Sequence, residues 1–460
     1  MKKQQRIVFL FLLSSVFITA QSWIPVGNAT GFSNTSAADQ HLAIDSNNVL
    51  YIAYQNTSGT PKNTTVKKFN GTTWETVGTT NFAANASTNS RNQSLMTDSN
   101  NVPYVAFSSF GDASVRGIKV MKFNGTAWES FGVGLDSDGR HSTNLAIDSN
   151  NMPIVASRGE ATNDNFYIKK YNSSNNTWEL LGGAGFTDNS NFPVLVLDTN
   201  DIPYIAYEDR ANGTKEAVVR KFNANTGQWD LVGVQGFSDG GIGYIDFAID
   251  TNNVLYVAYI DEANSSKLTV KKFVNTNWET VGTTGFSNVA LSGDISLALD
   301  NNNLPYVAYR RSPSSFTRTT EVLKFNGTIW EALGGDTQFA NDADHHDLII
   351  DNNNTPYLAY KDFDNGGKTV VLKFDATASV KDHVLQAQIT LYPNPITDKL
   401  SVNSSILSIQ QLEIYNVLGK RLITAINKTT LHLSRLATGI YLLKISTDKG
   451  VVIKKFIKNK

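Results

Sequence analysis

One segment recurs seven times along this 460-residue chain, and it constrains the fold more than any other feature. Its first copy, residues 44–54, reads IDSNNVLYIAY, an apolar run ending at an aspartate, then a polar turn and a second apolar run. Successive copies lie 50 to 53 residues apart. The seven aspartates are Asp45, Asp98, Asp148, Asp198, Asp250, Asp300 and Asp351. A fixed period of this length indicates a repeat architecture.

Each repeat contains four short runs that are typical of β-strands. A second signature, such as residues 68–75 (KFNGTTWE), follows each aspartate segment except the last. Runs of about five β-branched and aromatic residues alternate with turns rich in Asn and Gly, and no helical period of adequate length appears. We therefore expect an all-β fold, a seven-bladed β-propeller with four strands per blade.

The tryptophans indicate that the ring is closed by the N-terminus. Six of the seven follow an aspartate segment, but the seventh repeat ends at residues 373–375 (KFD) without one. The unpaired Trp23 begins residues 23–27 (WIPVG), which resemble the fourth strand at residues 74–78 (WETVG). We expect residues near Trp23 to supply the outer strand of the last blade, which also protects a sheet edge.

The two ends of the chain differ from the repeat. Lys2, Lys3 and Arg6 precede an apolar run at residues 7–19, so residues 1–20 are predicted to be a signal peptide. We expect the propeller to span 21–376, a linker to span 377–387 and a small β-sandwich to span 388–460. No other segment is long and apolar enough for a membrane span, so no transmembrane segment is expected after signal removal.

The last segment carries three short motifs. They comprise Tyr392, Pro393, Asn394 and Pro395, then Leu418, Gly419 and Lys420, then Gly439 and Tyr441. In this combination the segment resembles the type A sorting domain of the bacterial type IX secretion system. The resemblance implies a source among the Bacteroidota and the secretion machinery as a partner. It also implies that the tail is removed on export and that the protein is then released or attached to the outer-membrane surface.

Charge and cysteine content exclude several classes of function. Residues 21–376 hold 25 basic and 37 acidic residues, a balance that repels nucleic acid. Residues 377–460 hold 12 basic and 4 acidic residues, a basic character that we interpret as part of the sorting segment. The chain has no cysteine, so it has no thiolate nucleophile and no Cys-ligated zinc. No phosphate-binding loop is visible, and no cofactor is expected.

The expected ligand site is the mouth of the central channel. In a propeller the loops that precede the first strand of each blade and those that follow the second strand share one face. Their residues depart from the repeat and are unusually charged. The candidate ligand-binding residues are His41, His141, Arg158, Glu208, Arg210, Asp246, Asp294, Arg310, His345 and Asp347. Such a mouth suits a polar ligand.

Two sets of residues in the sequence resemble metal ligands. Asp344-His345-His346-Asp347, with Asp342, offers ligands for a divalent metal, but adjacent residues of a strand point to opposite faces. The seven Asp turns lack the carboxylate density of calcium loops and are expected to cap turns on the opposite face. We therefore predict no metal site.

The sequence favours recognition over catalysis. No single carboxylate pair stands out, and the Ser-x-Asp-x-Gly-x-x-Trp box of sialidases is absent. We expect a secreted or surface module that binds a glycan or a surface protein at the loop face. A hydrolase or lyase acting on extracellular polysaccharide is the alternative, because fold alone does not decide catalysis.

Overall fold

The computed structural model describes most of the chain after the signal segment. The described residues are 22–58, 61–82, 89–110, 117–133, 135, 139–159, 165–183, 187, 189–211, 213–314, 317–334, 342–375, 389–404, 408–416, 420–447 and 450–459. They belong to two compact units, one of Trp23–Phe374 and one that contains the chain from Asp375 onward. The predicted signal peptide and linker lie outside the described residues.

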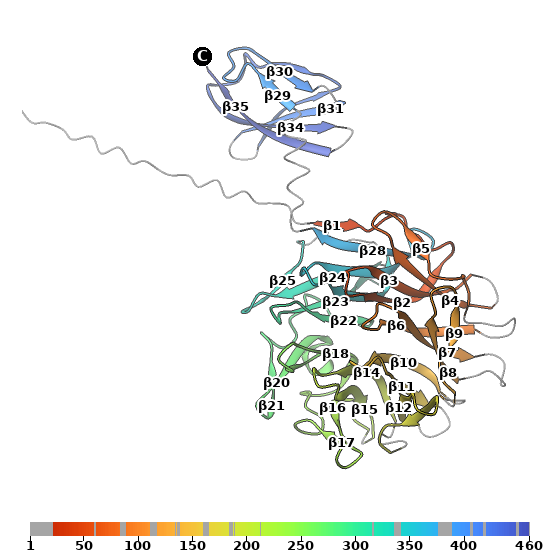
Figure 1. Ribbon diagram of the computed structural model, residues 1–460. Helices are drawn as coiled ribbons and strands as arrows, with labels where there is room; N and C mark the ends of the chain where they lie inside the picture. The colour runs from red at the N-terminus through yellow and green to blue at the C-terminus, as the bar shows by residue number, and fades with distance from the viewer. Residues whose placement is uncertain are drawn as a thin grey trace, which may run out of the picture. The chain divides into compact units, whose positions relative to one another are not determined.

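The larger unit is a closed ring of seven four-stranded antiparallel sheets (Figure 1). The first strands of the blades are β2 (Ala37–Ile44), β6 (Asn89–Thr97), β10 (Gly139–Ile147), β14 (Ser190–Leu197), β18 (Ile242–Ile249), β22 (Ile295–Leu299) and β26 (Ala343–Ile350). The second strands are β3 (Leu50–Asn56), β7 (Pro103–Phe110), β11 (Pro153–Gly159), β15 (Pro203–Asp209), β19 (Leu255–Asp261), β23 (Pro305–Ser314) and β27 (Pro356–Asp362). Each first strand packs against its neighbours, and β26 packs against β2, so the first strands surround the axis.

The third and fourth strands complete each blade outward. The third strands are β4 (Asn63–Phe69), β8 (Gly117–Phe123), β12 (Phe166–Asn172), β16 (Glu216–Asn223), β20 (Lys267–Val274), β24 (Thr317–Phe325) and β28 (Lys368–Asp375). The fourth strands are β5 (Trp74–Thr76), β9 (Trp128–Ser130), β13 (Thr177–Leu180), β17 (Gln228–Leu231), β21 (Asn277–Thr280), β25 (Trp330–Ala332) and, for blade seven, β1 (Ser22–Pro25). The pairing of β1 with β28 confirms the predicted closure. One short 3-10 helix, η1 (Glu262–Asn264), follows β19.

The repeated aspartate turn joins the first and second strands and links neighbouring blades. Asp45 Oδ1 accepts the backbone N–H groups of Asn47 and Val49, both at 2.9 Å. The Ser46 N–H donates to Asn101 Oδ1 of the next blade at 2.9 Å. The equivalent bond forms at all seven interfaces, ending with Asn352 N–H to Asn48 Oδ1 at 3.3 Å. The turn aspartates therefore cap turns, as expected, and the turns themselves form a closed ring.

The tryptophans form a second closed ring near the outer strands. Each indole Nε1 donates to a backbone carbonyl of the preceding blade, as Trp74 does to Val26 at 2.8 Å. The seven bonds are complete, from Trp23 to Trp330. The buried hydrophobic residues fall into seven clusters, one between each pair of adjacent blades. The repeated aromatic residues therefore stabilise the packing of each blade against its neighbours.

The C-terminal unit is a small two-sheet β domain. One sheet has the order β29 (Ile389–Tyr392), β30 (Lys399–Ser404), β33 (Thr430–His432). The other has the order β32 (Arg421–Ile426), β31 (Ile409–Asn416), β34 (Gly439–Thr447), β35 (Gly450–Lys458). Their inner faces share one core, which includes Ile389, Leu412, Leu443 and Phe456.

Candidate functional site

The innermost strands begin with an unusual residue at one repeated position. Six residues before the turn aspartate stand Asp39, Asn92, Ser142, Phe192, Tyr244, Asp294 and His345. All except Asp294 have a positive φ, between 33° and 54°. In those six strands the pairing with the second strand shifts register near the same residue, which marks a β-bulge. In six of the seven blades this position therefore leaves the regular pairing of the sheet, and its residue type differs from blade to blade. We call these seven residues the mouth ring.

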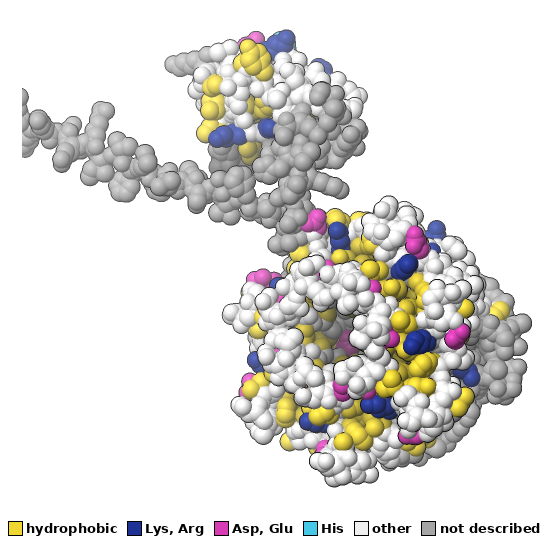
Figure 2. All heavy atoms as spheres, viewed as in Figure 1, with side chains coloured by type: hydrophobic (Ala, Val, Ile, Leu, Met, Phe, Trp, Pro, Cys, Tyr) yellow, Lys and Arg dark blue, Asp and Glu magenta, His cyan; other side chains and the backbone are white. Residues whose placement is uncertain are grey.

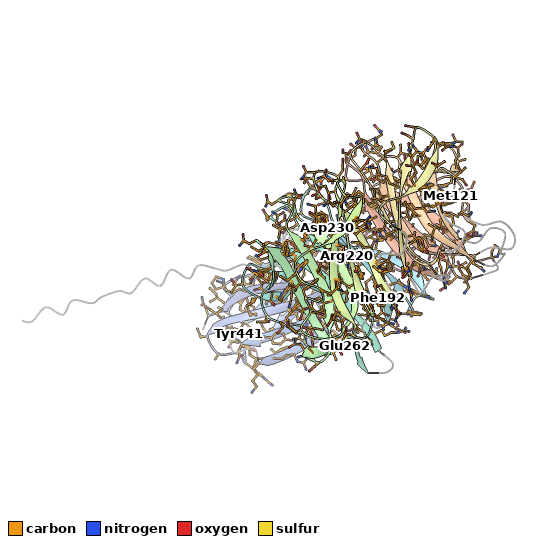
Figure 3. The ribbon with its side chains drawn as sticks, turned by 90° about the horizontal axis from the view of Figure 1, so that it is seen from below. Met121, Phe192, Arg220, Asp230, Glu262 and Tyr441 are labelled. Carbon is orange, nitrogen blue, oxygen red and sulfur yellow. The ribbon has the colours of Figure 1, made fainter. Side chains whose placement is uncertain are left out.

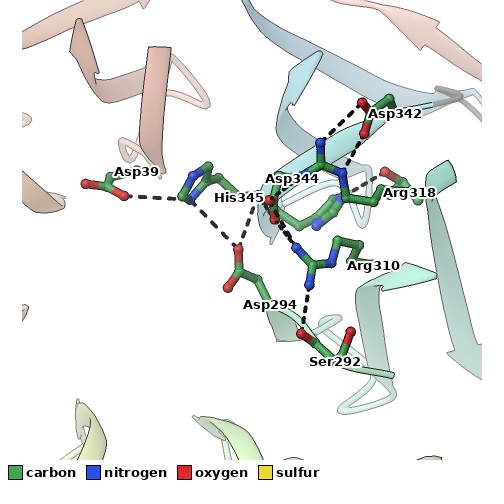
Figure 4. Close-up of polar contacts among 10 residues, drawn as sticks. Asp39, Ser292, Asp294, Arg310, Arg318, Asp342, Asp344 and His345 are labelled. Atoms are coloured by element: carbon green, nitrogen blue, oxygen red, sulfur yellow. Dashed lines mark hydrogen bonds and ion pairs between the residues drawn. The ribbon is translucent and has the colours of Figure 1, made fainter. Parts of the chain in front are cut away.

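One side of the mouth ring is a cluster of His345, Asp39 and Asp294, from blades seven, one and six (Figure 4). His345 Nδ1 lies 3.6 Å from Asp39 Oδ1 and 3.8 Å from Asp294 Oδ2. The His345 side chain is 34% exposed. Backbone amides hold both carboxylates: Asn92 N–H donates to Asp39 at 2.9 Å and His345 N–H donates to Asp294 at 3.2 Å. Figure 2 shows the hollow at the centre of the ring.

Two arginines and two aspartates extend this cluster toward the third strand of blade six. Arg310 Nη1 donates to both oxygens of Asp344, at 3.1 and 3.0 Å, and its Nη2 donates to the Ser292 carbonyl at 2.7 Å. Arg318 donates to both oxygens of Asp342, at 2.6 and 3.2 Å. Its Nη1 lies 3.4 Å from Asp344 Oδ2, so Asp344 is shared by both guanidinium groups. The bidentate pairing of Arg318 with Asp342 fixes the geometry of these two charged groups.

The two neighbouring carboxyl groups of the cluster have opposite pKa shifts. Burial is the largest influence on Asp294 and raises its pKa above the ordinary value, with Asp344 adding to the rise and His345 opposing it. Burial also acts to raise the pKa of Asp344, but the positive charges of His345 and Arg310 outweigh it and hold the pKa below its ordinary value. The pair therefore combines a carboxyl that protonates readily with one that stays ionised.

The other side of the mouth ring is aromatic. Phe192 of blade four and Tyr244 of blade five stack with ring centroids 4.8 Å apart and an interplanar angle of 28°. Both side chains are half-buried. Phe192 is labelled in Figure 3, which views its blade from below. Sequence reasoning did not single out these two aromatics, because it searched the mouth for charge; their shared position in the repeat was the available signal.

Three of the predicted ligand residues lie two positions further along the first strand and join neighbouring blades. His41 Nδ1 accepts the Leu95 N–H at 3.3 Å, Asp246 accepts the Leu297 N–H at 2.6 Å, and Asp347 accepts the Leu42 N–H. At the same repeat position Ser94, Asn144 and Ser296 accept the equivalent N–H groups, each at 3.0 Å. We call this set the blade clasps. They also occupy His41, Asp246 and Asp347 with a structural contact.

Blade four lacks this clasp, because its residue is Val194. The Phe247 N–H that a side chain at this position would receive donates instead to Oδ1 of the adjacent Asp246, at 2.8 Å. The Asp246 carboxylate thus accepts two backbone N–H groups, that of Phe247 in its own strand and that of Leu297 in blade six. Burial raises the pKa of Asp246 to about 7, with the nearby charge of Asp347 acting in the same direction and both amides opposing it.

The remaining predicted residues lie at the ends of second strands or outside the described side chains. Glu208 pairs with Arg210 within blade four, and Asn191 Nδ2 lies 3.4 Å from Glu208. Arg158 is opposite His141 in the pairing of β10 with β11, but the His141 side chain lies outside the described residues. Among the described contacts, none joins Glu208 or Arg210 to the His345 cluster. Of the ten candidates, the structure brings Asp294, Arg310 and His345 together directly.

The two adjacent histidines of blade seven take different environments. His346 Nε2 lies 2.7 Å from the Thr320 hydroxyl, away from the contacts of His345. Burial lowers the pKa of His346 to about 3, so this imidazole is neutral. Within the part of the chain that the structure describes, no group of three or more His, Cys, Asp or Glu side chains is arranged to hold a metal ion.

The C-terminal motifs combine exposed and structural residues. The Tyr392 side chain is 71% exposed, whereas Asn394 Oδ1 accepts the Ile457 N–H at 3.0 Å and thus ties its loop to β35. Tyr441 donates its hydroxyl to the Ala437 carbonyl at 2.9 Å, next to Gly439 at the start of β34. The Lys420 N–H donates to Asn416 Oδ1 at 2.9 Å. Leu418 and Gly419 lie outside the described residues; Pro393 and Pro395 lie in the described loop after β29.

The sequence of this unit matches a family of known function. Residues 390–459 match the secretion system C-terminal sorting domain. The sorting domain marks the chain as a secreted or cell-surface protein that engages a secretion machinery. In the described residues, no helix is long and apolar enough to cross a membrane. A comparison with curated proteins gave no match to the chain.

The ring is similar in fold to several solved structures at low sequence identity. A fungal alcohol oxidase of the AA5 family, in complex with copper, has 12% identity and a TM-score of 0.51, over 96% of this chain and 100% of that one. PorZ, a surface component of the type-IX secretion system of Porphyromonas gingivalis, has 13% identity and a TM-score of 0.45, over 91% of this chain. This chain spans 59% of the length of PorZ. A PL25 ulvan lyase has 11% identity and a TM-score of 0.48, over 76% and 95%. These similarities concern the fold alone.

Proposed function

We propose that the propeller is a secreted, non-catalytic recognition module that binds a glycan at its mouth ring, and that the type IX secretion system exports it. The observation that carries the proposal is the two-sided mouth ring. The stacked Phe192 and Tyr244 form one side, and His345, Asp39 and Asp294 form the other. All five occupy one repeat position, six residues before the turn aspartate, whose residue type varies from blade to blade.

The two sides match the two kinds of surface on a sugar. The C–H face of a pyranose packs on aromatic rings, as other apolar groups do. Hydroxyl groups donate to carboxylates and exchange hydrogen bonds with imidazole. Backbone amides of neighbouring blades already hold Asp39 and Asp294 in place, so little side-chain freedom is lost when a ligand binds.

The ion pairs of the cluster support binding rather than turnover. Asp344 is engaged by Arg310 and Arg318, and Asp342 is engaged by Arg318. These carboxylates are committed to charged partners within the protein. We infer that the cluster is a fixed polar wall against which a ligand docks.

One observation favours polysaccharide cleavage as the second candidate. Asp294 has a raised pKa and Asp344 a lowered one, and such a separation is the usual arrangement for an acid and a base in one site. A hydrolase or lyase would use Asp294 as its proton donor. The two candidates make different predictions for the same variant.

The experiment applies the purified secreted protein to a glycan array and then incubates it with each polysaccharide that it binds. We expect binding without new reducing ends or unsaturated products. Phe192→Ala and His345→Ala should each weaken binding by about tenfold or more. Arg210→Ala, which removes a charged side chain outside the cluster, should leave the glycan affinity unchanged.

Three results would overturn parts of the proposal. Product release that Asp294→Asn abolishes would establish the enzyme instead. Binding that survives both Phe192→Ala and His345→Ala would remove the ligand from the mouth ring. An array without any bound glycan, together with capture of a surface protein, would replace the glycan by a protein ligand.

A further inference from the structure

A row of lysines on the third strands faces a row of acidic residues on the fourth strands. In six blades the two are directly opposite in the antiparallel pairing. The six pairs are Lys68 with Glu75, Lys122 with Glu129, Lys170 with Glu179, Lys221 with Asp230, Lys272 with Glu279 and Lys324 with Glu331. Figure 3 labels Asp230 on its outer strand. Opposite charges placed this way offset each other.

The seventh blade breaks this pattern because its fourth strand comes from the N-terminus. The Val26 N–H donates to the Val371 carbonyl at 2.8 Å, as the Val77 N–H donates to the Val66 carbonyl at 2.9 Å in blade one. The same register therefore places Ile24 opposite Lys373, where the other six blades have a carboxylate. The rings of Trp23 and Phe374 pack edge to face beside them with centroids 5.5 Å apart, and those of Trp74 and Phe69 pack at a tilt with centroids 5.4 Å apart. Lys373 thus lacks the cross-strand partner of its six counterparts.

A pocket of about 790 Å³ lies where Lys373 meets the next blade. Its lining includes Lys373, Lys68, Tyr357, Phe69 and Ile24, and it contains no Asp or Glu. The equivalent pocket between blades one and two has about 390 Å³ and is lined by Lys68 and Lys122, both of which face a glutamate. The pocket at the closure of the ring is therefore larger and carries less compensated positive charge. We call it the closure pocket.

Three carboxylates outside the lining contact lining residues: Asp45 accepts the Val49 N–H, Glu75 accepts from the Asn70 side chain, and Asp351 lies beside Tyr357. Asp351 Oδ1 accepts the N–H groups of Asn353 and Thr355, at 2.9 and 2.7 Å. Its Oδ2 lies 3.5 Å from the Tyr357 hydroxyl. Among the described residues, no ion pair joins Lys68 or Lys373 to a carboxylate within 4.0 Å. Both lysines line the pocket: Lys68 is exposed and stands opposite Glu75, whereas Lys373 is half-buried and has no carboxylate opposite it.

We propose that the closure pocket binds an acidic saccharide, a sugar unit that carries a carboxylate or a sulfate. Its volume is within the range of small-ligand sites. Lys68 and Lys373 would hold the anionic group, and Tyr357 and Phe69 would offer aromatic surface to the sugar ring. The site is distinct from the mouth ring, because its lining comes from the turns after the first and third strands, at the opposite ends of these strands.

The decisive variant gives blade seven the cross-strand carboxylate that the other six blades have. Ile24→Glu places a carboxylate opposite Lys373, as Glu75 stands opposite Lys68. Calorimetric titration of the purified secreted protein would use a heparin-derived hexasaccharide, a polygalacturonate hexamer and neutral maltohexaose. We expect one or both acidic oligosaccharides to bind, maltohexaose not to bind at this pocket, and affinity to fall with added salt. Ile24→Glu and Lys373→Gln should each weaken binding by about tenfold or more.

Two controls separate charge from folding and from the mouth ring. Ile24→Gln has a similar size without the charge and should retain binding. Lys324→Gln removes the equivalent lysine of blade six, which faces Glu331, and should also retain it. Equal losses in Lys324→Gln and Lys373→Gln would overturn the proposal in favour of diffuse attraction. Loss in His345→Ala but not in Ile24→Glu would place the acidic sugar at the mouth ring, and failure of both acidic probes to bind would reject the closure pocket as a site.

Discussion

The indole Nε1 of Trp23 donates a hydrogen bond of 3.0 Å to the backbone carbonyl of Leu333, which is 310 residues away in the sequence. This contact joins the N-terminal strand β1 to blade six, while the carbonyl of Val26, the residue after β1, accepts the indole N–H of Trp74 in blade one. The N-terminal strand therefore bonds to both neighbours of the blade that it completes. The ring has no covalent closure, so these contacts and the pairing with β28 close it.

Trp23→Ala is expected to open the ring at this blade. Removal of a large, half-buried aromatic costs about 3 kcal/mol of unfolding free energy, and here it also releases the strand that covers β28. Hydrogen exchange measured by mass spectrometry should rise in Val370–Leu372 of β28. Trp178→Ala removes the equivalent side chain within an internal blade and should not affect β28. Unchanged exchange in β28 of the Trp23 variant would contradict non-covalent closure by this strand.

Gly182→Ala should destabilise the propeller by more than the strain of its backbone. Gly182 has a φ of +85°, and a Cβ there would lie 2.6 Å from the indole of Trp229 in the next blade. A matched control is Gly71→Ala, whose φ is +95° but whose Cβ would have no atom within 4 Å. Left-handed strain costs each variant about 1–2 kcal/mol, and crowding against Trp229 adds about 1–3 kcal/mol to the first alone. Equal midpoints in urea unfolding would contradict this contact.

The repeat and its closure could be predicted from the sequence because each depends on residue types that recur at a fixed spacing. Asp45 and its six equivalents, and Trp23 with its six, each occupy a position whose side chain makes the same contact in every blade. Periodicity alone could therefore locate the strands and count the blades. The sorting segment was predicted in a different way, from short motifs such as the one that begins at Tyr392, because these motifs lie in one continuous segment of the sequence.

The site was predicted less well, because its geometry depends on which way each first strand points a side chain. His41, Asp246 and Asp347 looked like members of a ligand site, but they stand at the clasp position and bond backbone amides of the next blade. The mouth ring lies two residues earlier, within a bulge that six of the blades have and that strand alternation does not reveal. Phe192 and Tyr244 were not predicted, because the candidate residues were chosen for their charge.

Asp246→Asn should change how stability depends on pH. The pKa of Asp246 is raised from 3.8 to about 7 in the folded chain. Its contribution to stability is therefore fully present below pH 3.8 and is lost as the pH rises through about 7. Asn144 makes the equivalent clasp in blade three, so asparagine is expected to keep the bond to Leu297. Thermal midpoints from pH 4 to 9 should show the variant gaining on the natural protein as the pH rises.

The difference between the two proteins isolates this residue from the others that titrate. His346 has a lowered pKa of about 3, so its effect has the opposite sign: stability is lost as the pH falls below 6.5. Both proteins contain His346, and its contribution cancels in the difference. Parallel curves across pH 4 to 9 would show that Asp246 does not change its protonation on folding.

Export should depend on Tyr392 in a way that folding does not. The side chain is 71% exposed, so Tyr392→Ala should leave the free energy of unfolding of the sorting domain within about 0.5 kcal/mol of the natural value. Asn394→Ala instead removes the acceptor for the Ile457 N–H and should destabilise the domain by about 1 kcal/mol.

If the secretion machinery contacts the exposed tyrosine, the Tyr392→Ala protein should accumulate in the periplasm, as the protein that lacks residues 388–460 should. Fractionation and immunoblotting of cells that produce each variant would measure this. Surface display of the deletion variant at normal levels would contradict a role of the tail in export, whereas normal display of Tyr392→Ala alone would show that recognition rests on other residues of the domain.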